Sequence, residues 1–349
     1  MQKDTVLAWR LARQGLAQPA RDPAEYRKLV RRLQPLAPVA NTRPGSPPRL
    51  VHRAGFDDGA LADRWRQRAE LLKGRFWRGN IGYVLAEDLE LYGTAFRKEL
   101  DRLNGTQERV YRALRSTGPL TPRQLKEETG LLNKQIMPAL HRLQQAFLVY
   151  EAQEDSSWER CWSLLAAEWP DVDLERRSWD QAAGLVLRRL VESLVFVTFD
   201  QVRDWSRLPA RQVRQVLEGM EAAGELVSCT VDGLGGGWSL AADHGLEPDR
   251  PGRAVHMLHR ADPLVMSHAS ELRQRFAGRE VLQYLLIDGE LRGAACGHWR
   301  IGPHDVDDIA LDLSRDEQED RRAEILAEVR RGYAAPASRI RRYVGREIR

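Results

Sequence analysis

The sequence is poor in lysine and in cysteine. Only six of its 54 basic residues are lysines, and none follows Lys134, which excludes a Schiff-base lysine from the rest of the chain. The three cysteines, Cys161, Cys229 and Cys296, are widely separated and form no Cys-x-x-Cys pair. This pattern excludes a disulfide framework and a zinc finger, and it favours a reducing compartment.

Long apolar segments are also missing. No run approaches the ~18 apolar residues that a membrane span needs, and the first residues, MQKDTVLAWRLARQGL, lack a signal-peptide core. We therefore expect a cytoplasmic protein without a membrane partner. The hydrophobic content of 42% is that of a folded protein, and 349 residues are enough for two to four compact units.

Arginine supplies most of the positive charge. The chain has 48 arginines and a net charge of +4. A GC-rich genome accounts for much of this usage, but guanidinium groups also suit phosphates and base edges. The composition therefore allows a nucleic-acid partner without proving one.

Residues 106–172 have the pattern of a winged helix-turn-helix. TQERVYRALRSTG predicts a helix capped by Thr106, and PLTPRQLKEETG predicts a second helix between the cap Thr121 and Gly130. LLNKQIMPALHRLQQA predicts a third helix, and FLVYEA and ERCWSLL predict a two-stranded wing. In this motif the third helix usually reads the DNA groove. Its exposed candidates for DNA contact are Lys134, Gln135 and Arg142.

The same architecture recurs at residues 178–245. A helix at 184–194 precedes a helix begun by Thr198, and LPARQVRQVLEGMEAAG predicts the third helix. LVSCTV and WSLA predict wing strands around DGLGGG, which we expect to be a flexible wing tip because no phosphate-loop context follows it. The candidates for DNA contact on the third helix are Arg211 and Arg214.

The two ends of the chain complete a helix-rich α+β fold. Residues 1–105 carry helical patterns in TVLAWRLARQGL, ALADRWRQRAELLKGRFWRGN and AEDLELYGTAFRKEL, and they predict a degenerate winged helix. Residues 255–349 contain the hairpin signal VLQYLLIDGELRGAACG and a closing helix. We therefore expect a small β-rich domain at the C-terminus.

The stretch QPLAPVANTRPGSPPRLVHR, residues 34–53, contains five prolines. A helix or a central strand is excluded there because proline lacks an N–H and fixes φ. We expect the prolines to preset a loop that presents polar side chains to DNA at low entropic cost. These side chains are Asn41, Arg43, His52 and Arg53.

Three segments carry a family resemblance. RFWRGNIGYVLAEDLELY places Trp77 beside Arg78, a pair that can stack on bases, although a core tryptophan is the commoner reason for this pattern. The segment resembles the W..RGTLHLLPAEDLPLY stretch of the AlkZ/YcaQ family of winged-helix DNA glycosylases. MLHRADPLVMSH and LLIDGELRG resemble the LLPxxDPLL and VDGxxxG segments of that family. The matching residues are Trp77, Arg78, Gly79, Tyr83, Ala86, Glu87, Asp88, Leu91, Tyr92, Leu258, Asp262, Pro263 and Leu264.

The resemblance implies a fold and an activity. The fold is a concave arrangement of three winged helices with a C-terminal β-barrel. We accordingly predict three tandem winged helix-turn-helix units followed by a small β-barrel-like domain. The implied activity is the excision of alkylated bases, including the unhooking of interstrand crosslinks, with water as the nucleophile and without a cofactor.

In that family the loop that corresponds to this stretch carries a Gln-x-Gln or Gln-x-Asp motif that positions and activates the attacking water, and an arginine matching Arg53 follows it. Counting back from Arg53 places the motif at Val39-Ala40-Asn41, and counting forward from LVRRL places it at Ala37-Pro38-Val39. A carboxamide or carboxylate can orient water and stabilise a cationic sugar, whereas valine cannot. Asn41 is therefore the candidate catalytic residue, at a motif from which Val39 departs.

The histidines at positions 259, 268, 298 and 304 fall in the C-terminal region. They lack the HxxxH spacing of a helical metal site and have no cysteine beside them, so we expect structural histidines and no metal.

Arg300, in GHWRIGPHD, is available to a partner. The complete set of predicted DNA-binding residues is Arg43, Arg53, Trp77, Arg78, Lys134, Gln135, Arg142, Arg211, Arg214 and Arg300.

We therefore predict a cytoplasmic, nucleoid-associated protein that binds double-stranded, damaged DNA. One hypothesis is a monofunctional DNA glycosylase that hydrolyses the N-glycosidic bond of alkylated or crosslinked bases. The alternative is a non-catalytic DNA-binding protein, a damage sensor or a transcription factor, that has lost the catalytic motif. A protein–protein scaffold built from winged helices is a third hypothesis.

Overall fold

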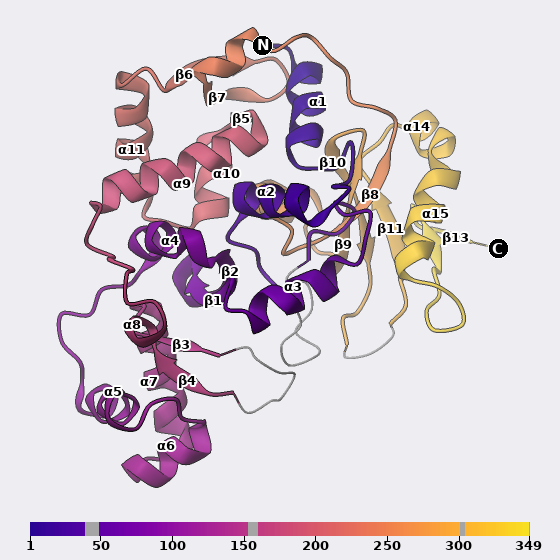
Figure 1. The fold of residues 1–349 in the computed structure, drawn as a ribbon. Helices are drawn as coiled ribbons and strands as arrows, with labels where there is room; N and C mark the ends of the chain where they lie inside the picture. The colour runs from indigo at the N-terminus through magenta and orange to yellow at the C-terminus, as the bar shows by residue number, and fades with distance from the viewer. Residues whose placement is uncertain (39–48, 153–159, 301–303, 349) are drawn as a thin grey trace.

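The computed structural model describes residues 1–38, 49–152, 160–300 and 304–348, and it shows a helix-rich α+β fold (Figure 1). Within these ranges, no helix is long and apolar enough to cross a membrane.

Residues 1–96 form helices and one hairpin: α1 (Lys3–Arg13), α2 (Pro23–Leu33), α3 (Asp58–Gln67), β1 (Leu71–Phe76), β2 (Asn80–Leu85) and α4 (Leu89–Phe96), with 3-10 turns η1 (Trp77–Gly79) and η2 (Ala86–Asp88). The helical prediction for LLKGRF is wrong. These residues form β1, which pairs antiparallel with β2 from Leu71 opposite Leu85 to Phe76 opposite Asn80. Cross-strand pairing has overridden the local helical pattern.

Residues 105–168 form a unit with its own hydrophobic core: α5 (Gly105–Thr117), α6 (Pro122–Thr129), α7 (Asn133–Gln145), β3 (Val149–Glu151), β4 (Trp162–Leu164) and α8 (Leu165–Glu168). Thr121 caps α6, and Gly130 ends it in the left-handed conformation, as predicted. The predicted cap Thr106 is wrong. Asn104 caps α5 instead, because its side chain and that of Gln107 satisfy each other's backbone N–H groups.

Residues 179–245 repeat the order of three helices followed by a hairpin: α9 (Trp179–Leu194), β5 (Phe196–Val197), α10 (Phe199–Ser206), α11 (Ala210–Ala222), β6 (Leu226–Val231), β7 (Gly235–Leu240) and η3 (Ala241–Gly245). The strand order is β5-β7-β6. The predicted wing tip is confirmed for Gly233 and Leu234, which lie in the turn between β6 and β7, but the three consecutive glycines that follow belong to β7. A Cβ on Gly237 would lie 2.1 Å from the carbonyl oxygen of Val197, so the approach of β5 requires glycine there.

The C-terminal region contains β8 (Val255–His259), α12 (Pro263–Ser267), α13 (Ala269–Arg275), β9 (Val281–Ile287), β10 (Glu290–Cys296), β11 (Asp308–Leu311), α14 (Arg315–Asp320), α15 (Arg322–Gly332), β12 (Arg342–Tyr343) and β13 (Arg346–Glu347). The predicted β9–β10 hairpin turns at Asp288 and Gly289, which both have positive φ. The barrel-like prediction is not met, because the six strands form an open sheet in the order β13-β12-β11-β10-β9-β8.

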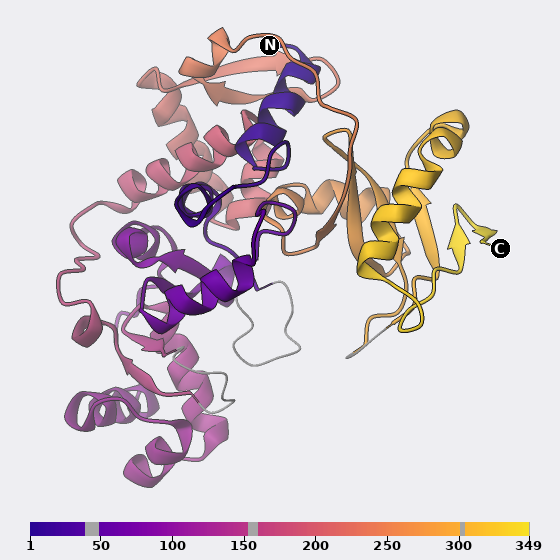
Figure 2. The ribbon, with the colours of Figure 1, turned by 45° about the vertical axis from the view of Figure 1, so that its right-hand side comes forward.

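This sheet is buried on both faces. Leu286 and Ala294 belong to the largest core, which also contains residues of α1, α4 and α9. Leu285 and Ala295 face the opposite way and pack with α15, which lies on the outer side of the sheet (Figure 2). The run VLQYLLI is nearly continuous in apolar residues because both of its faces are covered.

Candidate nucleic-acid interface

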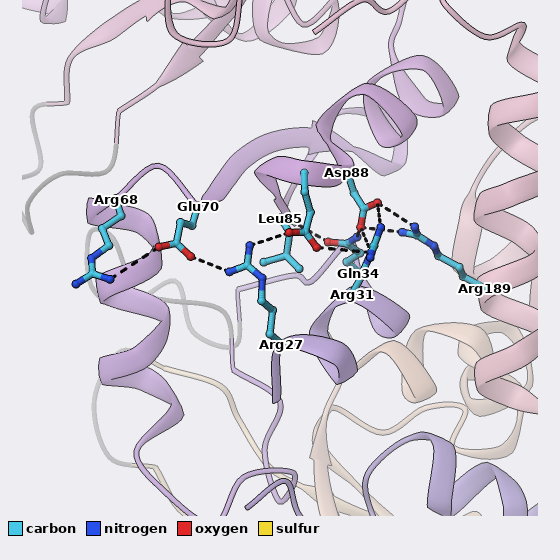
Figure 3. A network of polar contacts seen from close by, with 9 residues as sticks. Arg27, Arg31, Gln34, Arg68, Glu70, Leu85, Asp88 and Arg189 are labelled. Carbon is cyan, nitrogen blue, oxygen red and sulfur yellow. Dashed lines mark hydrogen bonds and ion pairs between the residues drawn. The ribbon is translucent and has the colours of Figure 1, made fainter. Parts of the chain in front are cut away.

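The proline-rich stretch begins at Gln34, directly after α2, in a buried polar network (Figure 3). Its side-chain Nε2 donates to Asp88 at 2.5 Å, and its Oε1 accepts from the backbone N–H of Leu85 at 2.8 Å. Asp88 also accepts from Arg189 of α9 and from Arg31 of α2. Asp88, in the AED segment that resembles the family, therefore holds the start of the proline-rich stretch in place.

Two residues later, the chain joins the first hairpin. Leu36 and Tyr83 exchange two backbone hydrogen bonds, of 2.9 and 2.8 Å. Ala37 and Pro38 then line a cavity. The forward count of the family motif, Ala37-Pro38-Val39, thus places its first two residues in a cavity wall. Val39, the candidate catalytic Asn41 and the predicted DNA contact Arg43 lie outside the described residues.

The other end of the stretch is held by buried groups. The Arg53 side chain has no exposed surface and donates to Asp262 and to Gln14. His52 Nε2 lies 3.0 Å from the carbonyl oxygen of Met257 and 3.0 Å from Glu328. The prediction that Arg53 and His52 face DNA is therefore corrected, because both side chains connect the stretch to the C-terminal region.

The cavity has a volume of about 800 Å³. Its walls come from the start of the proline-rich stretch, the first hairpin, the end of α10 and the C-terminal region. The lining residues are Ala37, Pro38, Arg75, Trp77, Gly79, Asn80, Ile81, Arg207, His259, Arg260, Ala261, Met266, Leu282, Gln283, Trp299, Arg300, His304 and Tyr333. Among the described residues of this lining there are four arginines and no Asp or Glu, so the cavity is strongly cationic.

Three of these arginines form no ion pair with a described carboxylate. Arg75 donates to Gln144 and to the carbonyl oxygen of Gly79, and burial lowers the pKa of its guanidinium. Arg207 and Arg260 are exposed. Many other arginines in the described ranges are paired with Asp or Glu, as in the contacts of Arg253 with Asp320 and Glu324. The uncompensated charge at the cavity favours an anionic partner.

In the turn between β1 and β2, the adjacent residues Trp77 and Arg78 lie in different environments. Trp77 and Arg78 both have positive φ, 34° and 61°, an uncommon conformation for such side chains. The Trp77 side chain points inward and is only 2% exposed, which corrects the prediction that it stacks on DNA bases. Its indole N–H has no hydrogen-bond partner among the described residues. Arg78 is exposed at the surface, and its Nε lies 3.3 Å from the carbonyl oxygen of Arg207.

The cavity also contains a neutral histidine. His259 Nδ1 accepts from the backbone N–H of Ala261 at 3.1 Å. Burial, assisted by the neighbouring charge of Arg260, lowers the pKa of His259 to about 4. The imidazole is therefore neutral at physiological pH, with its proton on Nε2, and the positive charge of the cavity comes from its arginines.

The predicted groove-reading helices present cationic side chains at the surface. Lys134, Gln135 and Arg142 on α7 are exposed, although the Gln135 amide oxygen accepts from the backbone N–H of Leu132. Arg211 and Arg214 on α11 are exposed, and Arg214 lies over the ring of Phe199. None of these lysine and arginine side chains forms an ion pair with a described carboxylate. Arg300 is exposed at the cavity rim.

Sequence reasoning missed Arg75, Arg207 and Arg260. Arg260 lies within the matched MLHRADP segment, which was a usable signal, but Arg75 was assigned to a helix and Arg207 follows α10 without any motif. The C-terminal histidines do not form one cluster, since His268 contacts Gln201 and Ser267, and His298 contacts Glu280. Within the described ranges, no group of three potential metal ligands is present.

Comparisons with known proteins identify the family. Residues 37–335 match the sequence model of the family described as DNA glycosylase AlkZ-like. Among solved structures, Streptomyces sahachiroi DNA glycosylase AlkZ is similar, with a TM-score of 0.70 and 16% sequence identity over 97% of this chain and 99% of that chain. No curated protein matches the sequence. Because the family match covers most of the chain, this protein belongs to the AlkZ-like DNA glycosylase family.

Proposed function

We propose that this protein binds damaged double-stranded DNA across the arginine-lined cavity. The observation that carries the proposal is the convergence of Arg75, Arg207 and Arg260, from three distant segments, without a described carboxylate partner. Such a surface neutralises phosphates and gains affinity from counterion release. Membership of a DNA glycosylase family favours damaged DNA over other polyanions.

We further propose that the chain consists of three winged helix-turn-helix units, at residues 1–105, 106–172 and 178–245, and a C-terminal domain at 255–349. The repeated order of three helices and a hairpin supports the second and third units. In this arrangement α7 and α11 supply additional phosphate contacts through their exposed lysine and arginine side chains. A protein that works on DNA in this way acts in the cytoplasm at the nucleoid.

Recognition without efficient base excision is the function that the cavity supports best. Hydrolysis of an N-glycosidic bond develops positive charge on the sugar, and a site for it needs a group that orients water and tolerates that charge. Ala37 and Pro38 have no polar side chain, and the arginines carry the wrong sign. The second candidate is a monofunctional glycosylase that uses Asn41, and family membership is the observation that favours it.

The test uses the full-length protein with duplexes that contain 7-methylguanine or a nitrogen-mustard crosslink, and with the matched undamaged duplex. Binding is measured by fluorescence anisotropy, and base release by alkaline cleavage at abasic sites. We expect tighter binding to damaged DNA and no cleavage above the control without protein. Cleavage above that control would favour the second candidate, an active glycosylase, over recognition without excision. Equal or absent binding to all three duplexes would overturn recognition of damage.

A further inference from the structure

The buried amide of Gln34 connects the cavity wall to the rest of the fold. Gln34 has no exposed surface. Its side chain donates to Asp88 and accepts from Leu85, and its backbone carbonyl oxygen accepts from the hydroxyl of Tyr92 at 3.0 Å. All of these groups are satisfied, so the conformation at Gln34 is strongly restrained.

Asp88 joins this amide to a distant helix. It is 4% exposed and accepts two hydrogen bonds of 2.9 Å from Arg189, on α9, about a hundred residues along the chain. Figure 3 shows Gln34, Arg31 and Arg189 converging on its carboxylate. Burial opposes ionisation, but the two arginines hold the pKa of Asp88 below its ordinary value. The carboxylate is therefore charged at physiological pH and binds all three donors together.

The restraint extends to the cavity. Between Gln34 and the cavity lies Pro35, which packs beside the bare backbone of Gly82. A Cβ on Gly82 would lie 3.3 Å from Pro35 and 2.8 Å from the ring of Trp77, a cavity residue. Leu36 is then fixed by its two bonds to Tyr83. Specific contacts therefore hold Gln34, Pro35 and Leu36, the residues that lead from Asp88 to the cavity wall at Ala37.

We propose that Asp88 is a positioning residue: through Gln34 it fixes Ala37 and Pro38 in the cavity wall, and through Arg189 it ties that wall to α9. This inference rests on the proposed function, because the wall belongs to the proposed DNA-binding cavity. In this proposal, Asp88 does not contact DNA.

Glu87 provides a matched control within the same turn. Its carboxylate is 40% exposed and pairs with Arg27 and Arg31, whereas the Gln34 side chain bonds to Asp88 and Leu85. Glu87→Gln and Asp88→Asn therefore make the same chemical change at neighbouring positions, and only Asp88→Asn removes the charge that the Gln34 amide contacts.

The experiment places a thiol probe in the cavity wall by Ala37→Cys, with Cys161 and Cys229 replaced by serine. The rate at which the introduced thiol reacts with a small maleimide is measured without DNA, far below the unfolding temperature. We expect Asp88→Asn to change this rate by about tenfold, because the segment loses a charge-assisted hydrogen bond that restrains it. Glu87→Gln is expected to leave the rate within about twofold.

A third variant separates positioning from general loss of stability. Leu125→Ala removes a buried side chain of α6 from the separate core of α5–α7, so it lowers the unfolding temperature without touching the cavity wall, and the reaction rate of the probe thiol should not change. If Asp88→Asn fails to fold, Gln34→Met, which leaves the Asp88–Arg189 pair intact, replaces it. Folded variants at Asp88 or Gln34 that react like Glu87→Gln would overturn the proposal. Since no DNA is present, failure of the proposed DNA-binding function would not affect this result.

Discussion

The guanidinium of Arg53 forms a two-point ion pair with the carboxylate of Asp262, with distances of 2.6 and 3.0 Å, across 209 positions of sequence. Both side chains are buried. The pair connects the end of the proline-rich stretch to the start of α12, so two segments that match the family in sequence are in direct contact. The arginine that ends the loop is a structural residue in this chain.

Arg53→Met should lower the free energy of unfolding by about 3–5 kcal/mol, because it leaves the carboxylate of Asp262 buried without its partner. Urea unfolding followed by circular dichroism measures the change. The control is Arg188→Met, since Arg188 is 48% exposed and lies 3.8 Å from Glu225, and it should cost less than about 1 kcal/mol. Equal costs for the two variants would contradict the role assigned to Arg53.

Removing two cavity arginines should reduce the salt dependence of DNA binding. If Arg207 and Arg260 each neutralise one phosphate, the double alanine variant should show a slope of log K against log salt that is shallower by about 2. Affinities for one duplex at a series of salt concentrations give this slope. Arg253→Ala, at an arginine already paired with Asp320 and Glu324, should leave the slope unchanged. An unchanged slope in the double variant would exclude these arginines from the interface.

Introducing carboxamide side chains at the two motif positions, Ala37 and Val39, should give the protein base-excision activity. Ala37→Gln places a side chain that can orient water in the cavity wall, and Val39→Gln restores the second carboxamide of the Gln-x-Gln motif in the forward count. A preorganised carboxamide dipole contributes about 100-fold. Alkali-revealed strand cleavage of a 7-methylguanine duplex measures the gain over the unaltered protein. The control, Ala37→Met with Val39→Met, has similar volume without the amide. A variant with glutamines no faster than the one with methionines would show that the cavity lacks other requirements for catalysis.

The contact between Glu328 and His52 should appear in the pH dependence of stability. Although burial opposes ionisation, His52 and the backbone N–H of Met257 lower the pKa of Glu328 from 4.5 to about 2. A depressed carboxyl pKa stabilises the fold above the unfolded-state value and loses this contribution as the pH falls from 4.5 towards 2. Glu328→Gln should therefore cost about 2–3 kcal/mol at pH 7.

Unfolding of the native protein and of Glu328→Gln, measured by urea between pH 7 and pH 3, should show the difference shrinking below pH 4.5, the ordinary value for this carboxyl. The exposed Glu319 provides the comparison, since Glu319→Gln should have little effect at any pH. A constant difference across this range would show that Glu328 acts through packing and not through its charge.

The sequence by itself determined the elements whose signals are local. Thr121 and Gly130 delimit α6, and Asp288 and Gly289 turn the β9–β10 hairpin, as the sequence predicts. These features depend on side chains bonding to nearby backbone and on positive φ, which are properties of a few consecutive residues. The order of the family segments was also sufficient to predict the family.

Only the tertiary structure decided which of the 48 arginines are buried and which line the cavity. Arg53 became a buried ion pair and Trp77 a wall residue, while Arg207 and Arg260, outside any predicted site, were brought to one cavity. Pairing with β2 made β1 a strand, and the six strands of the C-terminal sheet pair in an open order. All of these outcomes depend on partners distant in sequence, and the free energy of burying or exposing a charge is set by those partners and not by its neighbours along the chain.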